Sequence, residues 1–244
     1  MRCVIAAAMV VSLSTAAFAQ EWTEFVSKED GFSTNFPGTP AITESTYRSQ
    51  FGADLPNRVY SASLGRSRFS VSVVDYRSIE KLLTEKAKSC PAGAETCLGG
   101  TGARSSTGAG YWKVDYAGAM IYATHELMKR DATITEFIWT NIDLVEGHML
   151  QLTNKDRSRT YVSIFMHADR LYIAEATVPA GDPEPGLFQQ ALGFVDANGN
   201  SIRYSMVYSN SYHGMGVSPA PALAGAGRGG GAATGGGAPP PTGK

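Results

Sequence analysis

The alternation of apolar and polar positions is clearest between Gly147 and Pro179, where three β-like runs follow one another. Val, Ile, Thr, Tyr and Phe dominate the runs, and short polar turns separate them at Asn154–Arg157 and Ala168-Asp169. This pattern is typical of β-hairpins. It predicts an antiparallel meander, the core of one domain, with strands at His148–Thr153, Thr160–His167 and Leu171–Val178.

The two turns also predict how the strands pair. Counting back from each turn places Met149 beside Val162 and Glu175, and His148 beside Ser163 and Ala174. One face of the meander is then apolar and needs cover from helices, with Glu175 as its lone charge. It comprises Met149, Val162, Ile164, Met166, Leu171 and Ile173.

On the other predicted face, aromatic side chains surround small ones and form a shallow trough. The trough residues are His148, Leu150, Tyr161, Ser163, Phe165, Tyr172, Ala174 and Ala176. Such a surface could receive an apolar ligand or a side chain of a partner. Alternatively, its small residues let one of the chain's own helices approach closely.

Similar patterns predict strands before the meander and helices around it. Apolar positions at helical spacing predict helices at Ser78–Cys90 and Asp115–Arg130, and a third from Asp182 to a C-cap at Gly193. Gly65-Arg66 reads as a two-residue hairpin turn. The sequence therefore predicts an α+β fold, in which an antiparallel β-sheet (meander plus N-terminal hairpins) packs with about three helices. The further predicted strands are Phe32–Phe36, Ala41–Arg48, Asn57–Leu64, Ser67–Tyr76, Thr133–Thr140 and Ile202–Tyr208.

The two ends of the chain differ from its middle. The first 19 residues have the pattern of a secretory signal peptide: a basic Arg2, an apolar run and then Ala17-Phe18-Ala19. The apolar run is too short to span a membrane. From about Ser211 the chain is Gly, Ala and Pro with little to bury, which predicts a disordered tail at 211–244. We therefore expect a single domain at 20–210, in the periplasm or secreted, with no transmembrane segment in the mature chain.

The charge of the chain limits which partners are expected, and its cysteine content indicates the cellular compartment. The 21 basic and 22 acidic residues nearly balance, and no basic cluster is visible, which argues against nucleic acid as a partner. Cys90 and Cys97 are the two cysteines beyond the leader, and in an exported protein such a pair predicts a disulfide. A redox-active pair is the alternative, although the spacing is not C-x-x-C.

No motif predicts a metal, a cofactor or a reaction. His125-Glu126 begins like a zinc-protease helix, but Lys129 stands where the second histidine is needed. Asp196–Asn200 resembles a calcium loop, but Val207 stands where that loop needs a glutamate.

The remaining acid–base candidates are isolated in the sequence. His148, His167 and Glu175 do not converge in the predicted register, which favours structural roles for them. Asp75 ends an apolar strand face, where an acid either caps a turn or acts in catalysis.

The chain is similar to the PsbP/Mog1-type α+β architecture in two respects. The first is its opening, which runs from Trp22 through Gly31-Phe32 to Phe36-Pro37-Gly38-Thr39-Pro40. The second is the order that follows, with paired strands, helices, the meander and a closing helix. The segments GHMLQLTN, RLYIAEATVP and GLFQQALGF also resemble a family of exported alphaproteobacterial proteins of unknown function. The resemblance covers Trp22 to about Tyr208. It implies a non-enzymatic binding or assembly role and offers no catalytic motif to transfer.

The sequence thus favours an exported, non-enzymatic binding or assembly module, whose partner is an unknown envelope protein or a small apolar ligand. One alternative is a hydrolase or other enzyme with an unrecognised site, using His148 or Asp75 as its base. Another is an envelope structural protein held by its tail. The lack of a nucleophile–base motif favours the binding module.

Overall fold

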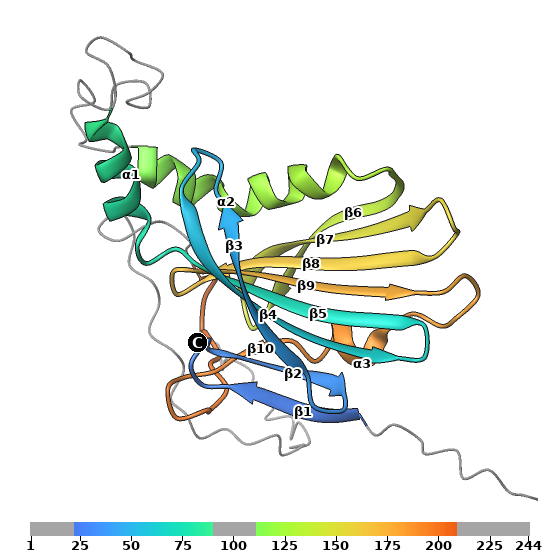
Figure 1. Ribbon diagram of the computed structural model, residues 1–244. Helices are drawn as coiled ribbons and strands as arrows, with labels where there is room; N and C mark the ends of the chain where they lie inside the picture. Colours follow the sequence, from blue (N-terminus) through green and yellow to red (C-terminus); the bar gives the residue numbers. More distant parts are fainter. Residues whose placement is uncertain (1–21, 90–110, 209–244) are drawn as a thin grey trace, which may run out of the picture.

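The computed structural model describes residues 22–89 and 111–208, and in them the chain folds into two antiparallel sheets and three helices (Figure 1). The large sheet has the strand order β3-β4-β5-β9-β8-β7-β6 and the small sheet the order β1-β2-β10. The predicted α+β class with antiparallel pairing is therefore confirmed. The strands are β1 (Trp22–Ser27), β2 (Phe32–Pro37), β3 (Ala41–Arg48), β4 (Asp54–Leu64), β5 (Ser67–Asp75), β6 (Ala132–Ile142), β7 (Val145–Asn154), β8 (Arg159–His167), β9 (Arg170–Val178) and β10 (Gly193–Phe194), and the helices are α1 (Ile79–Lys88), α2 (Tyr111–Met128) and α3 (Gly186–Gln189).

Some predictions fall on other parts of the chain. The signal peptide at 1–19, the Cys90–Cys97 disulfide and the tail at 211–244 lie outside the described residues. Within those residues, no helix is both long enough and apolar enough to span a bilayer.

The meander forms as predicted, but one of its two registers differs. Ala168-Asp169 makes the expected two-residue turn, with φ of 46° and 60°, and Val162 pairs with Glu175. The β7–β8 turn has three residues, 155–157, one fewer than predicted, because Arg157 adopts a left-handed φ of 66° and Asn154 pairs with Ser158 through the backbone.

The shorter turn shifts the pairing of the whole of β7 by one position. Met149 lies opposite Ser163, and His148 lies opposite Ile164. Since side chains alternate along a strand, the shift moves each β7 side chain to the other face of the sheet. The predicted positions of Met149, His148 and Leu150 are therefore wrong.

The face of the large sheet that carries Val162 and Ile164, here called the helix face, packs against α1 and α2. The helices predicted at Ser78–Cys90 and Asp115–Arg130 are confirmed to within a few residues, and Tyr116, Ala123 and Leu127 of α2 are buried against the sheet. Ser78 stands at the N-cap of α1, and its side chain makes no cap hydrogen bond. Glu175, the one charge predicted on the apolar face of the meander, forms a salt bridge with Arg130, the two side chains approaching to 2.8 Å.

The opposite face, here called the small-sheet face, carries Phe165 and Tyr172 and packs against the small sheet and α3. Phe188 is the anchor of α3, with its ring centroid 5.6 Å from that of Phe36 and 5.4 Å from that of Phe69. α3 is much shorter than predicted. Gly193 does not cap it but begins β10, because pairing with β2 places Phe194 opposite Phe32.

The predicted last strand at Ile202–Tyr208 is also wrong. In place of a strand, this part of the chain forms isolated β-bridges, which pair Val195 with Ser201 and Val145 with Tyr208. The segment still contributes to the core, since Tyr208 is buried and its hydroxyl accepts a hydrogen bond from the Ala168 backbone N–H at 3.1 Å.

The helices α1 and α2 do not cover the whole of the helix face, and the small sheet and α3 do not cover the whole of the small-sheet face. The small-sheet face is open over part of β6, β7 and β8, and the helix face is open over part of β4, β5 and β9. Each open region is hollowed into a groove, and the two grooves lie on opposite faces.

Candidate functional site

The larger groove lies on the small-sheet face beside α3, with a volume of about 1330 Å³, and is here called the α3 groove. Strand alternation points four side chains of β7 and β8 into its floor: Met149, Gln151, Tyr161 and Ser163. The other lining residues come from β6, from α3 and the segments on either side of it, from the start of the described chain, and from two more positions of β7 and β8. Those lining residues are Glu24, Ser33, Glu136, Thr140, Asn141, Ile142, Asp143, Leu150, Phe165, Glu184, Gln189, Gln190, Ala191, Leu192, Gly193, Asn200, Ser201 and Arg203.

Tyr161 gives the floor a buried ring with a polar tip. The ring lies 5.6 Å from the Arg159 guanidinium, within the range of a cation–π contact, and Gln151 Nε2 lies 3.5 Å from the hydroxyl. Burial raises the pKa of Tyr161, because desolvation disfavours the phenolate. The floor therefore offers a neutral donor and acceptor beside an apolar surface.

The walls of the α3 groove are acidic and rich in amides. Four carboxylates line it, from Glu24, Glu136, Asp143 and Glu184, and its one basic side chain, Arg203, already lies 3.8 Å from Asp143. Asparagine and glutamine side chains each donate and accept hydrogen bonds. A lining of this kind suits a neutral or cationic molecule with hydrogen-bonding groups.

The predicted trough residues divide between the groove and the core. Tyr161, Ser163 and Phe165 line the α3 groove, as does Leu150, although the Leu150 side chain belongs to the helix-face core. Tyr172 and Ala174 lie buried under the small sheet. The Tyr172 hydroxyl donates to the Asp30 carbonyl oxygen at 2.7 Å.

His148 is separated from the trough because of the register shift. Its side chain is 3% exposed and lies under α2, where Nδ1 is 2.7 Å from the Thr124 hydroxyl oxygen. The ring of Trp139 meets it edge to face at 4.5 Å between centroids. Burial lowers the pKa of His148, because desolvation disfavours the charged imidazolium.

The other acid–base candidates have structural partners. Asp75 accepts a hydrogen bond from the Arg77 backbone N–H at 2.9 Å and forms a salt bridge with the Arg77 side chain at 2.6 Å. His167 Nε2 lies 2.7 Å from the Tyr204 hydroxyl oxygen. Among the described residues, no three His, Cys, Asp or Glu side chains gather as metal ligands would.

Sequence reasoning missed much of the α3 groove. Met149 and Gln151 were expected on the core face or left unassigned, and the correct β7–β8 turn length would have placed them in the floor. The wall residues Gln189 and Gln190 follow from the pairing of β10 with β2, which no local pattern indicates.

The chain matches no protein-family model and no curated protein. Among solved structures it is similar to the solution structure of cyanobacterial PsbP (CyanoP) from Synechocystis sp. PCC 6803, at 14% sequence identity and a TM-score of 0.38. The similarity covers 76% of this chain and 98% of that chain. We therefore infer the chemistry of the α3 groove from its own residues.

Proposed function

We propose that this protein is an exported binding module and that the α3 groove holds its ligand. The observation that carries the proposal is the open half of the small-sheet face, where the sheet is hollowed to about 1330 Å³. Ligand sites for small molecules commonly measure about 300–1,000 Å³, so the groove accommodates an extended molecule or a short segment of one. Export is supported by the signal-peptide pattern of residues 1–19.

The lining supports a neutral or cationic ligand that carries several hydrogen-bonding groups. The excess of carboxylates over Arg203 disfavours an anion, because like charges repel where water is partly excluded. Gln151, Gln189 and Asn200 present amides that match hydroxyl or amide groups. Met149 and Ile142, which are partly exposed, supply an apolar surface for the rest of the molecule.

Binding, rather than catalysis, is supported by where the acid–base candidates lie. His148 faces α2, and Asp75 is bound by Arg77. In the described part of the chain, no histidine lines the α3 groove. The floor and walls therefore offer hydrogen bonds and contact area, which are the requirements of a binding protein.

The test blocks the groove without touching the core. Ala191→Trp places a large ring in the wall of the groove, whereas Ala197→Trp places the same ring on an exposed loop residue outside it. Thermal-shift measurements would use neutral oligosaccharides, spermidine, short neutral peptides and, as an anionic comparison, citrate.

We expect a neutral or cationic probe to raise the melting temperature of the wild type and of Ala197→Trp, and to leave Ala191→Trp unshifted. The proposal is wrong if citrate is the preferred probe. It is also wrong if the shift persists in Ala191→Trp, or if no probe class produces a shift.

A further inference from the structure

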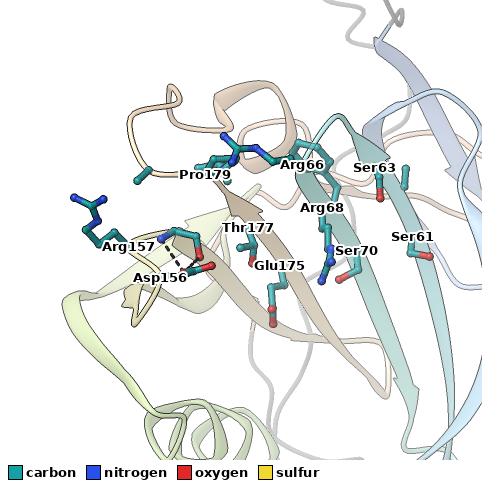
Figure 2. Close-up of a pocket in the computed structure, with 15 residues that line it drawn as sticks. Ser61, Ser63, Arg66, Arg68, Ser70, Asp156, Arg157, Glu175, Thr177 and Pro179 are labelled. Atoms are coloured by element: carbon teal, nitrogen blue, oxygen red, sulfur yellow. Dashed lines mark hydrogen bonds between the residues drawn. The ribbon is translucent and has the colours of Figure 1, made fainter.

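The second groove lies on the helix face of the large sheet, beyond the region that the helices cover, and has a volume of about 740 Å³. Three arginines line it, Arg66, Arg68 and Arg157, together with serine and threonine side chains (Figure 2). We call it the arginine groove. It lies on the opposite face of the sheet from the α3 groove and has opposite charge character.

The strand register explains why these polar side chains gather. Ser63 lies opposite Arg68, Arg68 opposite Thr177, and Ser70 opposite Glu175, so that they all project from the helix face. Between them along the same strands, Phe69 and Ala176 project from the small-sheet face into the core. The same three strands therefore present a polar surface on one side and a packed core on the other.

The turns bring the other two arginines to the rim. Arg66 belongs to the β4–β5 turn, whose first residue, Gly65, has a φ of 58°. Arg157 is the left-handed residue of the β7–β8 turn, a conformation in which glycine or asparagine is favoured. Figure 2 shows Arg66 beside Pro179, Arg68 beside Ser70 on β5, and Arg157 at the rim formed by the Asp156 turn.

The two carboxylates of the groove are already engaged. Glu175 forms a salt bridge with Arg130 at 2.8 Å. Asp156 accepts hydrogen bonds from the Ser158 hydroxyl at 2.6 Å and the Ser158 backbone N–H at 3.0 Å, and these bonds lower the pKa of its carboxyl.

The three arginines, in contrast, are unengaged. Within residues 22–89 and 111–208, Arg66, Arg68 and Arg157 form no ion pair and no side-chain hydrogen bond, although other arginines of the chain pair with carboxylates. The hydroxyls of Ser61 and Ser70 likewise have no hydrogen bond in that part of the chain. The groove therefore holds positive charge in excess, together with hydrogen-bond donors that the protein itself does not use.

We propose that the arginine groove binds a small molecule that carries one or more phosphate groups. A guanidinium presents a planar set of N–H donors that fits the oxygens of an oxyanion two at a time. The three arginines and the serine hydroxyls supply more donors than the two oxygens of a carboxylate accept, whereas a phosphate offers three or more. This site is independent of the α3 groove and of the ligand proposed for it.

The test titrates the protein with inorganic phosphate and with pyrophosphate by calorimetry, at an ionic strength held constant with chloride. Arg68→Gln and Arg157→Gln each remove the guanidinium group and its charge from an exposed side chain and leave the core untouched. Arg48→Gln removes an equal charge on β3, away from the groove, where Arg48 forms an exposed pair with Asp54.

We expect pyrophosphate to bind the wild type and Arg48→Gln alike, and to bind each groove variant at least about tenfold more weakly, as the loss of a charged hydrogen bond predicts. Arg68→Lys, which keeps the charge but loses the planar fork, should fall between the wild type and Arg68→Gln. Ala191→Trp should bind pyrophosphate as the wild type does.

Two results would overturn the assignment. The first is heat no greater than that of chloride at equal ionic strength, which would mean screening by ions only. The second is unchanged pyrophosphate affinity in a variant that carries both Arg68→Gln and Arg157→Gln and whose melting temperature matches that of the wild type.

Discussion

The Tyr60 hydroxyl donates a hydrogen bond to the Asp30 carboxylate at 2.5 Å and so joins the large sheet to the turn of the small one. Tyr60 is 2% exposed, and the Ser27 hydroxyl lies 3.0 Å from the same phenol oxygen. Arg58 adds a salt bridge to Asp30 at 3.0 Å. The contact between the two sheets is therefore held by a buried polar cluster as well as by aromatic packing.

Tyr60→Phe should lower the free energy of unfolding by about 1–3 kcal/mol, because it leaves the Asp30 carboxylate and the Ser27 hydroxyl short of a buried partner. The matched control is Tyr47→Phe, since the Tyr47 hydroxyl is buried without a hydrogen-bond partner in the described part of the chain. That substitution should be neutral or stabilising. Urea denaturation measures both, and equal effects of the two substitutions would contradict the role given to Tyr60.

His167 should make the fold less stable as the pH falls. It is 2% exposed and lies 4.3 Å from the Phe194 ring, and burial, with a smaller contribution from Arg170, lowers its pKa to about 4. The folded pKa lies below the unfolded value of about 6.5, so the unfolded chain takes up the proton first. Stability is then complete above pH ~6.5 and falls by up to about 3 kcal/mol as the pH approaches 4.

The measurement is the pH dependence of urea unfolding in the wild type and in His167→Phe. The variant should be less sensitive to pH between about 6.5 and 4, since it has lost a group whose pKa changes on folding. Parallel curves for the wild type and His167→Phe would contradict the assignment, and the buried His148 contributes equally to both.

Gly147→Ala should destabilise the protein strongly, because there is no room for a methyl group. A Cβ at this position would lie 2.3 Å from Phe165 Cδ1 and 2.5 Å from the Ile164 carbonyl oxygen. We expect a loss of about 2–3 kcal/mol, as overpacking of a close-packed core predicts. Gly186→Ala, whose Cβ would meet no atom within 4 Å, is the control. Thermal unfolding compares the two variants, and similar melting temperatures would be inconsistent with the packing at Gly147.

Local patterns predicted most of the elements, because strand alternation and turn residues act over short stretches. The Ala168-Asp169 turn has two residues with positive φ, and the β8–β9 register follows from it. The length of the β7–β8 turn was predicted wrongly, since an arginine gives no signal for the left-handed φ that Arg157 adopts. That single residue placed His148 and Leu150 on the wrong face.

The sites depend on contacts between distant parts of the chain, which no window of sequence contains. Arg68 and Arg157 meet in one groove only after β5 has paired with β9. The sequence therefore showed no basic cluster, although the fold makes one. In the same way, Gln189 becomes a groove wall only because Phe194 pairs with Phe32.

The pairing of β10 with β2 also determines when the α3 groove can form. Its walls include Glu24 and Ser33 from the beginning of the described chain, and Asn200 and Arg203 from its end. Contacts of such high sequence separation form late, because a long loop must close before they stabilise anything. A chain still emerging from the ribosome or a translocation channel can build the β4–β5 hairpin, but it has no ligand site until nearly all of the domain has been released.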